Sequence, residues 1–144
     1  MSVLPLVLPE LVIDAVGVPA PQGSKSFKGM RAGKPVLVES SKKVAPWRAA
    51  VESAARARMA LTGWTTLDGP IELLIVFFLP RPRSVRRVWP TAYPDSSKLL
   101  RSTEDALVRA GVVADDARFV HHDVWKRYAL EVPGARITVR PVAS

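Results

Sequence analysis

The sequence predicts one α+β domain, a small mixed β-sheet with two main helices. Its 144 residues are about the length of one domain, and 48% of them are hydrophobic, enough for a single core. Strand-like runs rich in β-branched residues alternate with two segments of helical periodicity. No repeat or long linker interrupts the chain, so residues 1–144 are expected to form a single domain.

The first half of the chain is expected to form two strands, a helix and a central strand. Residues 11–18 are rich in β-branched side chains and end in a Pro- and Gly-rich loop; a polar, basic stretch follows. Residues 34–39 then form a second short strand or a hairpin arm. From Val44 the apolar spacing is helical, and Gly63 closes that helix. The apolar run at residues 71–79 predicts a central strand covered on both faces.

The second half is expected to form a helix and two strands. Ser96 or Ser97 can cap a helix that runs to about Ala110, and Gly111 stands where a C-cap glycine belongs. Residues 119–130 and 136–142 then form two strands joined through a Pro-Gly turn. The predicted order is therefore β-β-α-β-α-β-β.

Composition excludes several classes of protein. The chain has no cysteine, which rules out a disulfide scaffold, a thiolate zinc site and a cysteine nucleophile. Its two histidines, His121 and His122, are adjacent, so in an alternating strand one points inward and the other outward. Each is expected to be a structural side chain. The opening segment lacks the basic start of an export signal, and the longest apolar run is too short to span a bilayer. A soluble, intracellular protein without membrane contact is expected.

The positive charge is concentrated in two loops. The formal net charge is +8, of which residues 20–43 hold +5 and residues 81–94 hold +4, so the rest is nearly neutral. Each loop also carries an aromatic residue. Basic, aromatic-bearing loops suit a phosphate backbone and unpaired bases, although a single charge run is usually only a solvated surface. The DNA-contacting side chains predicted here are Lys25, Lys28, Arg31, Arg81, Arg83, Arg86 and Arg87.

Acidic residues cluster beside the second basic loop. Residues 95–116 contain five of the chain's 13 acidic residues. If the second helix and the next strand bring Asp95 and Asp116 together, their carboxylates suit Mg²⁺-dependent phosphodiester hydrolysis. The simpler interpretations are a helix cap at Asp95 and a turn at Asp115-Asp116.

A family resemblance supports the first interpretation. The segments YPDSSKLLRSTEDAL (residues 93–107) and AGVVADD (residues 110–116) resemble the signature of RusA-type Holliday-junction resolvases. That pattern is approximately P-D-x-D-N/K-L-x-K/R, three residues and D-A-L, followed by G-hydrophobic and D-D. Residues 17–24 resemble the family's N-terminal strand and loop, and Lys126 matches a basic position on the strand after the acid pair.

The resemblance implies a RusA-like fold and a homodimeric, Mg²⁺-dependent endodeoxyribonuclease. Such an enzyme resolves four-way DNA junctions by paired nicks in DNA recombination and repair, as a cytoplasmic protein that is bacterial or phage-encoded. By position, Asp95 and Asp116 would be metal ligands supported by Asp115, and Arg101 would be the basic catalytic residue. Lys126 would contact DNA. Asp105 follows Arg101 by four residues, where the two form either an orienting ion pair or an ordinary surface pair.

The sequence departs from the family pattern at one metal-ligand position. Ser97 stands where the pattern has its second aspartate, and a neutral hydroxyl is a weaker ligand for Mg²⁺. Three outcomes are open: weak cleavage, junction binding without cleavage, or a deliberately inactivated form of an active enzyme. A basic RNA- or ribosome-associated domain without a metal is an alternative of another class.

A two-fold dimer suits a junction with two equivalent strands to cut. Its surface is expected from apolar residues of the N-terminal strand (Leu11, Val12, Ile13) or of the first helix (Trp47, Val51).

Overall fold

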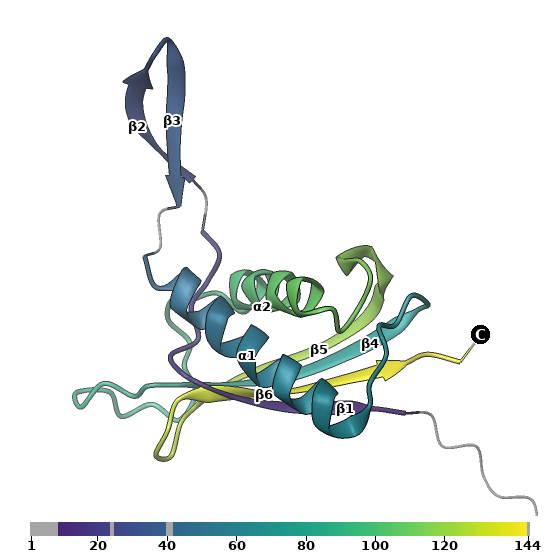
Figure 1. Ribbon diagram of the computed structural model, residues 1–144. Coiled ribbons are helices and arrows are strands. Elements are labelled where there is room, and N and C mark those ends of the chain that lie inside the picture. The colour runs from purple at the N-terminus through teal and green to yellow at the C-terminus, as the bar shows by residue number, and fades with distance from the viewer. Residues whose placement is uncertain (1–8, 24, 40–41, 144) are drawn as a thin grey trace, which may run out of the picture.

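The structure is a computed structural model, and it describes residues 9–23, 25–39 and 42–143. The described residues contain the helices and strands that the sequence predicts, together with an additional strand and a short 3-10 helix (Figure 1). In chain order the elements are β1 (Leu11–Val16), β2 (Lys25–Arg31), β3 (Lys34–Glu39), α1 (Val44–Thr62), β4 (Ile71–Leu79), α2 (Ser96–Ala110), the short 3-10 helix η1 (Asp116–Arg118), β5 (Phe119–Tyr128) and β6 (Gly134–Pro141).

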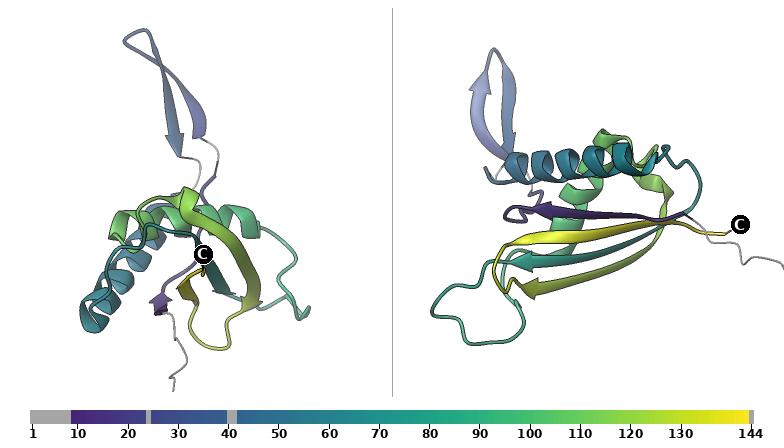
Figure 2. Two further views of the ribbon diagram at one scale, coloured as in Figure 1. Left: turned by 90° about the vertical axis from the view of Figure 1, so that its right-hand side faces the viewer. Right: turned by 60° about the horizontal axis from the view of Figure 1, so that its bottom comes forward.

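Four strands form a mixed sheet in the order β1-β6-β4-β5. β4 pairs in parallel with β5 and antiparallel with β6, which confirms the predicted α+β class. Both helices cover the same face of this sheet (Figures 1 and 2). Alternate residues of β4, from Ile71 to Leu79, are buried, whereas those between them are only half-buried. β4 is central, since it pairs with β6 on one side and β5 on the other, but the expectation that both of its faces are covered was wrong, because both helices lie on one face and the residues on the other face are only half-buried.

The core lies between that face and the two helices. Trp47 of α1 is 1% exposed, and its indole Nε1 donates a hydrogen bond to Thr103 Oγ1 of α2 at 3.2 Å. Leu11, Ile13 and Val51 are fully buried in the same core. The prediction that these residues and Trp47 supply a dimer surface was therefore wrong. Their apolar side chains hold the helices against the sheet.

A hairpin arm of β2 and β3 projects from the body (Figures 1 and 2). β3 was predicted, whereas β2 falls in the stretch expected to be a basic loop. The two strands meet at Ala32 and Gly33, whose φ values of 54° and 75° are those of a tight two-residue hairpin turn. β2 escaped prediction because its polar, glycine-containing sequence lacks a strand's apolar alternation.

Helix α2 ends where the sequence predicts, but the predicted cap at Ser96 or Ser97 was wrong: Asp95 is the N-cap residue, so the helix begins one or two residues earlier. Gly111 ends it with φ 84°, a left-handed conformation that favours glycine. The helix buries Leu99, Ser102, Thr103, Ala106 and Leu107. Within the described residues, no helix is both long and apolar enough to cross a membrane.

Candidate functional site

Asp95 occupies the N-cap position of α2, directly after the basic loop of residues 81–94, here called the arginine loop. Its backbone is extended, with φ −70° and ψ 140°, but its carboxylate accepts no capping hydrogen bond from the helix. The side chain is exposed. Asp95 is thus the cap by position, as the simpler interpretation has it, but its exposed carboxylate makes no capping hydrogen bond to the helix.

Lys126 of β5 fixes the backbone just before Asp95. Its Nζ donates hydrogen bonds to the carbonyl oxygens of Ala92, at 3.1 Å, and Pro94, at 2.9 Å. Lys126 is half-buried, and hydrogen bonds from a charged ammonium to two backbone carbonyls are stronger than neutral ones. The sequence predicts a DNA contact for Lys126, which no observation tests; the structure shows that its ammonium binds the backbone that leads into Asp95.

Asp115 and Asp116 form an exposed pair ahead of β5. Asp115 accepts a hydrogen bond from the Ala117 backbone N–H at 3.0 Å, which lowers the pKa of Asp115. The pKa of Asp116 is raised, first by its side-chain hydrogen bond with Asp115 and further by the negative charge of that neighbour. The turn interpretation holds for Asp115, which caps η1. Asp116 remains a carboxyl crowded by a like charge.

Glu104 and His122 form a second pair that sequence reasoning did not assign. His122 Nε2 lies 3.3 Å from Glu104 Oε2. Burial raises the pKa of Glu104, and the Asp116 charge adds to this, while His122 and Arg101 oppose it. The sequence did carry a signal for Glu104. It follows Arg101 by three residues, and Arg101 follows Ser97 by four, so the three side chains share one face of α2.

The predicted pair of Arg101 and Asp105 is replaced by other partners. Asp105 Oδ2 lies 3.2 Å from Arg48 Nη1 of α1 and 3.4 Å from Arg109 Nη2 of α2. Asp105 thus ties the two helices together. Arg101 is exposed on the face that also carries Ser97, which is likewise exposed.

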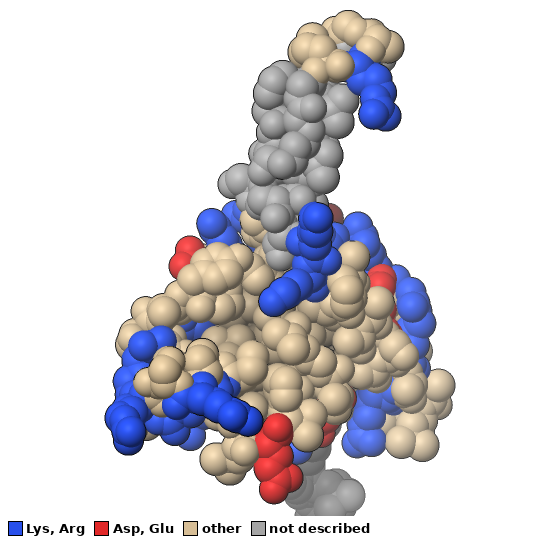
Figure 3. All heavy atoms as spheres, turned by 90° about the vertical axis from the view of Figure 1, so that its left-hand side faces the viewer, with Lys and Arg blue, Asp and Glu red and all other residues tan. Residues whose placement is uncertain are grey.

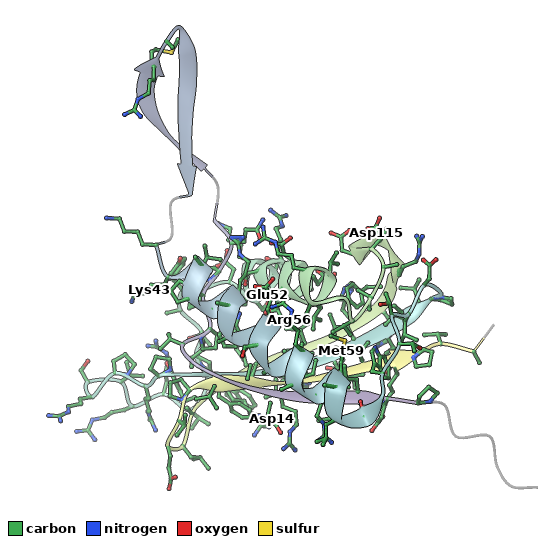
Figure 4. The ribbon with its side chains drawn as sticks, viewed as in Figure 1. Asp14, Lys43, Glu52, Arg56, Met59 and Asp115 are labelled. Carbon is green, nitrogen blue, oxygen red and sulfur yellow. The ribbon has the colours of Figure 1, made fainter. Side chains whose placement is uncertain are left out.

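The acidic groups lie at different points along α2. Asp95 precedes α2. Asp116 instead interacts electrostatically with Glu104 and Asp105, which lie in the second half of α2. Figure 4 shows Asp115 beyond the end of α2 that lies away from the arm. Across the described ranges, no three Asp, Glu or His side chains form a group able to hold a metal ion. The structure thus brings Asp115 and Asp116 together but does not show Asp95 joining them in such a group.

Basic side chains surround one end of the molecule. Figure 3 shows Lys and Arg on both sides of a largely uncharged central area, with few acidic side chains. Arg83, Arg86 and Arg87 of the arginine loop are exposed, as is Arg31 near the arm's turn. Arg81 instead donates hydrogen bonds to loop carbonyls of Val85 and Arg87, both at 3.1 Å. The predicted Lys25 and Lys28 belong to β2, but their side chains lie outside the described part of the structure.

Comparison with known proteins identifies the family. The sequence profile of the family Endodeoxyribonuclease RusA matches residues 17–140, most of the chain. The chain belongs to the RusA endodeoxyribonuclease family. The segments that carry Asp95, Arg101 and Asp116 all lie within the matched range, and the mixed sheet with two helices is consistent with a RusA-like fold. RusA membership implies nuclease activity on Holliday junctions.

The other comparisons add little to the RusA assignment. No curated protein matches the chain. Among solved structures, a protein of unknown function from Agrobacterium tumefaciens is similar at 12% identity and a TM-score of 0.40, with 88% of this chain and 86% of that chain covered. A likeness at that level carries no argument about function.

Proposed function

We propose that this RusA-family protein is a Mg²⁺-dependent endodeoxyribonuclease that resolves four-way DNA junctions by paired nicks. It would act in recombination and repair as a cytoplasmic protein of bacterial or phage origin. The observation that carries the proposal is the exposed carboxylate of Asp95, which lies between the arginine loop and α2 and makes no capping hydrogen bond to the helix. An exposed carboxylate beside a cationic surface is suited to bringing a metal ion to a phosphate.

The oxygen chemistry of the proposed ligands suits a hard divalent cation, while the described residues form no group of three acidic or histidine side chains around one point. Mg²⁺ is commonly held by one or two carboxylates, with waters and substrate phosphate oxygens completing its shell. The side-chain hydrogen bond with Asp115 raises the pKa of Asp116 most, and the negative charge of Asp115 adds to it; a bound cation would offset that charge. Asp95 and Asp116 are the proposed ligands, Asp115 supports Asp116, and Ser97 takes the weak third position. When bound, the metal would polarise the scissile phosphate and lower the pKa of the attacking water.

The chain's own residues have separate tasks in this proposal. Exposed Arg101, one helical turn beyond Ser97, would stabilise negative charge on the phosphate in the transition state. Lys126 would hold the backbone before Asp95 in place through its two carbonyl contacts. The exposed arginines of the loop would bind flanking phosphates, where they displace counterions.

Cleavage and binding assays on a synthetic four-way junction test the proposal. Asp95→Asn and Asp116→Asn should each abolish cleavage, while Mg²⁺-free binding persists or tightens because a repulsive charge is removed. Arg101→Ala should lower the cleavage rate with little change in Mg²⁺ affinity. The parent should prefer the junction over a duplex of the same sequence. Equal affinity for both DNAs would overturn the junction specificity.

A non-catalytic junction-binding protein is the second candidate function. It is favoured by Ser97 at a ligand position and by the lack of a three-group metal cluster among the described residues. Ser97→Asp separates the two candidates, because it restores the missing carboxylate. A sharp rise in cleavage and in Mg²⁺ affinity by calorimetry would support the nuclease. No change in either would favour the binding protein, and equal Mg²⁺ affinity in the parent, Asp95→Asn and Ser97→Asp would refute the ligand assignment.

Paired nicking also requires two active sites on one junction, so we propose a two-fold homodimer. Light scattering at micromolar concentration should give twice the 15.7 kDa chain mass. A monomer both with and without DNA would contradict paired nicking by one assembly.

A further inference from the structure

A preformed cavity adjoins Asp95 but is separate from the acidic groups. It has a volume of about 340 Å³ and lies between residues 18–21 and the loop that follows β4. Pro94, directly before Asp95, belongs to its lining. A cavity of this size is at the lower end of the range for small-molecule sites.

The lining combines aromatic rings, prolines and two cations. Tyr93 and Tyr128 both line the cavity, and six other lining residues are prolines, which have no backbone N–H to donate. Lys43 and Arg87 supply the positive charge. Flat apolar surfaces next to cations match a molecule that joins an aromatic ring to a phosphate. A nucleotide has that chemistry.

Hydrogen bonds hold the segments on both sides of the cavity. On one side, Ser102 Oγ donates to the Ala20 carbonyl at 2.7 Å, and the Gln22 N–H donates to the Lys98 carbonyl at 3.0 Å. On the other, the Lys126 ammonium holds the carbonyls of Ala92 and Pro94. The cavity therefore needs little ordering when a ligand enters, which reduces the entropic cost of binding.

We propose that this cavity, the Tyr93 pocket, receives one unstacked nucleobase of the bound DNA, next to the phosphate presented to Asp95. This inference deepens the proposed function and rests on it. Tyr93 is 71% exposed, so its ring is available for stacking, and Lys43 and Arg87 would contact the adjoining phosphates. A paired base inside a duplex cannot enter, which favours nucleotides at a branch point or in a single strand.

Binding of 2-aminopurine oligonucleotides in EDTA tests the pocket without cleavage. One strand of a four-way junction, and a matched single strand, carry the fluorescent base at successive positions. One position should show a fluorescence change on binding, and Tyr93→Ala should abolish it and weaken binding about 5- to 150-fold, the range for loss of one aromatic stack. Tyr93→Phe should retain the affinity. Trp125→Ala is the matched control, since Trp125 is 53% exposed but outside this lining.

An abasic nucleotide at the responding position supplies the decisive comparison. The abasic nucleotide should weaken binding to the parent by the same factor as Tyr93→Ala does. It should cause no further loss in the Tyr93→Ala variant, because both changes remove the same contact between the base and the ring. Additive losses, or a Tyr93→Ala variant with parental affinity and signal, would overturn the pocket. If the parent shows no preference for the junction over the duplex but keeps the Tyr93-dependent fluorescence signal, the proposed function is refuted and the pocket is not.

Discussion

Replacing Lys126 by methionine separates a positioning role from a DNA contact. Methionine keeps an unbranched apolar side chain but removes the ammonium that binds the carbonyls of Ala92 and Pro94. A hydrogen bond to a charged group contributes about 1.5–3 kcal/mol, and water replaces part of it at a half-buried site. We therefore expect Lys126→Met to lower the free energy of unfolding by about 1–3 kcal/mol, since two such bonds are partly offset by hydration.

Two measurements follow from that perturbation. Urea unfolding gives the stability change, and fluorescence anisotropy gives junction affinity as a function of salt. A positioning residue should leave the slope of log affinity against log salt unchanged, whereas a phosphate contact contributes about 0.9 to it. The cleavage rate should fall, because the backbone before Asp95 is no longer held.

Arg83→Met is the matched control. Arg83 is exposed in the arginine loop and was predicted to contact DNA. This variant should reduce the salt slope by about 0.9 and change stability by less than about 0.5 kcal/mol. The positioning role is refuted if Lys126→Met instead behaves like Arg83→Met, with a smaller salt slope and parental stability.

Two further predictions concern the acid pair and the sheet. In NMR titrations, the pKa of Asp116 should exceed that of Asp115, and Asp115→Asn should lower the pKa of Asp116 toward its ordinary value. Mg²⁺ affinity should rise as the pH increases through the Asp116 pKa, because the metal and the proton compete for the Asp116 carboxylate. A Cβ at Gly134 would clash with the Ala15 carbonyl oxygen on the neighbouring strand, so Gly134→Ala should cost about 1–3 kcal/mol of stability by urea unfolding. Gly69→Ala, which meets nothing within 4 Å, should not.

Elements with a strong local signal could be predicted from the sequence. The C-terminal end of α2 at Gly111 and the central position of β4 follow from glycine chemistry and apolar spacing, whereas the N-cap fell at Asp95 rather than at Ser96 or Ser97. β2 could not be predicted, because its strand pairing depends on β3 and a two-residue turn rather than on an apolar face. The one-sided cover of β4 also escaped prediction, since a local apolar run does not specify what packs on each face.

The candidate site shows the same division. Spacing alone places Ser97, Arg101 and Glu104 on one face of α2. Spacing could not show that Lys126 reaches the carbonyl before Asp95, or that Asp105 pairs with Arg48 of another helix. Such partners depend on how β5 and α1 pack against α2, which is a tertiary property.

The pairing of Glu104 with His122 depends on a single irregularity in the sheet. The register of β4 with β5 passes from Ile71–Phe119 to Glu72–His121, so Val120 has no partner on β4. Strand side chains alternate between faces, so one inserted residue reverses the face of everything that follows. Phe119, before the inserted residue, is buried; because of the insertion, His122, three residues later, lies on the same face and reaches Glu104. The sequence predicts that one histidine turns inward, but only the bulge determines which one.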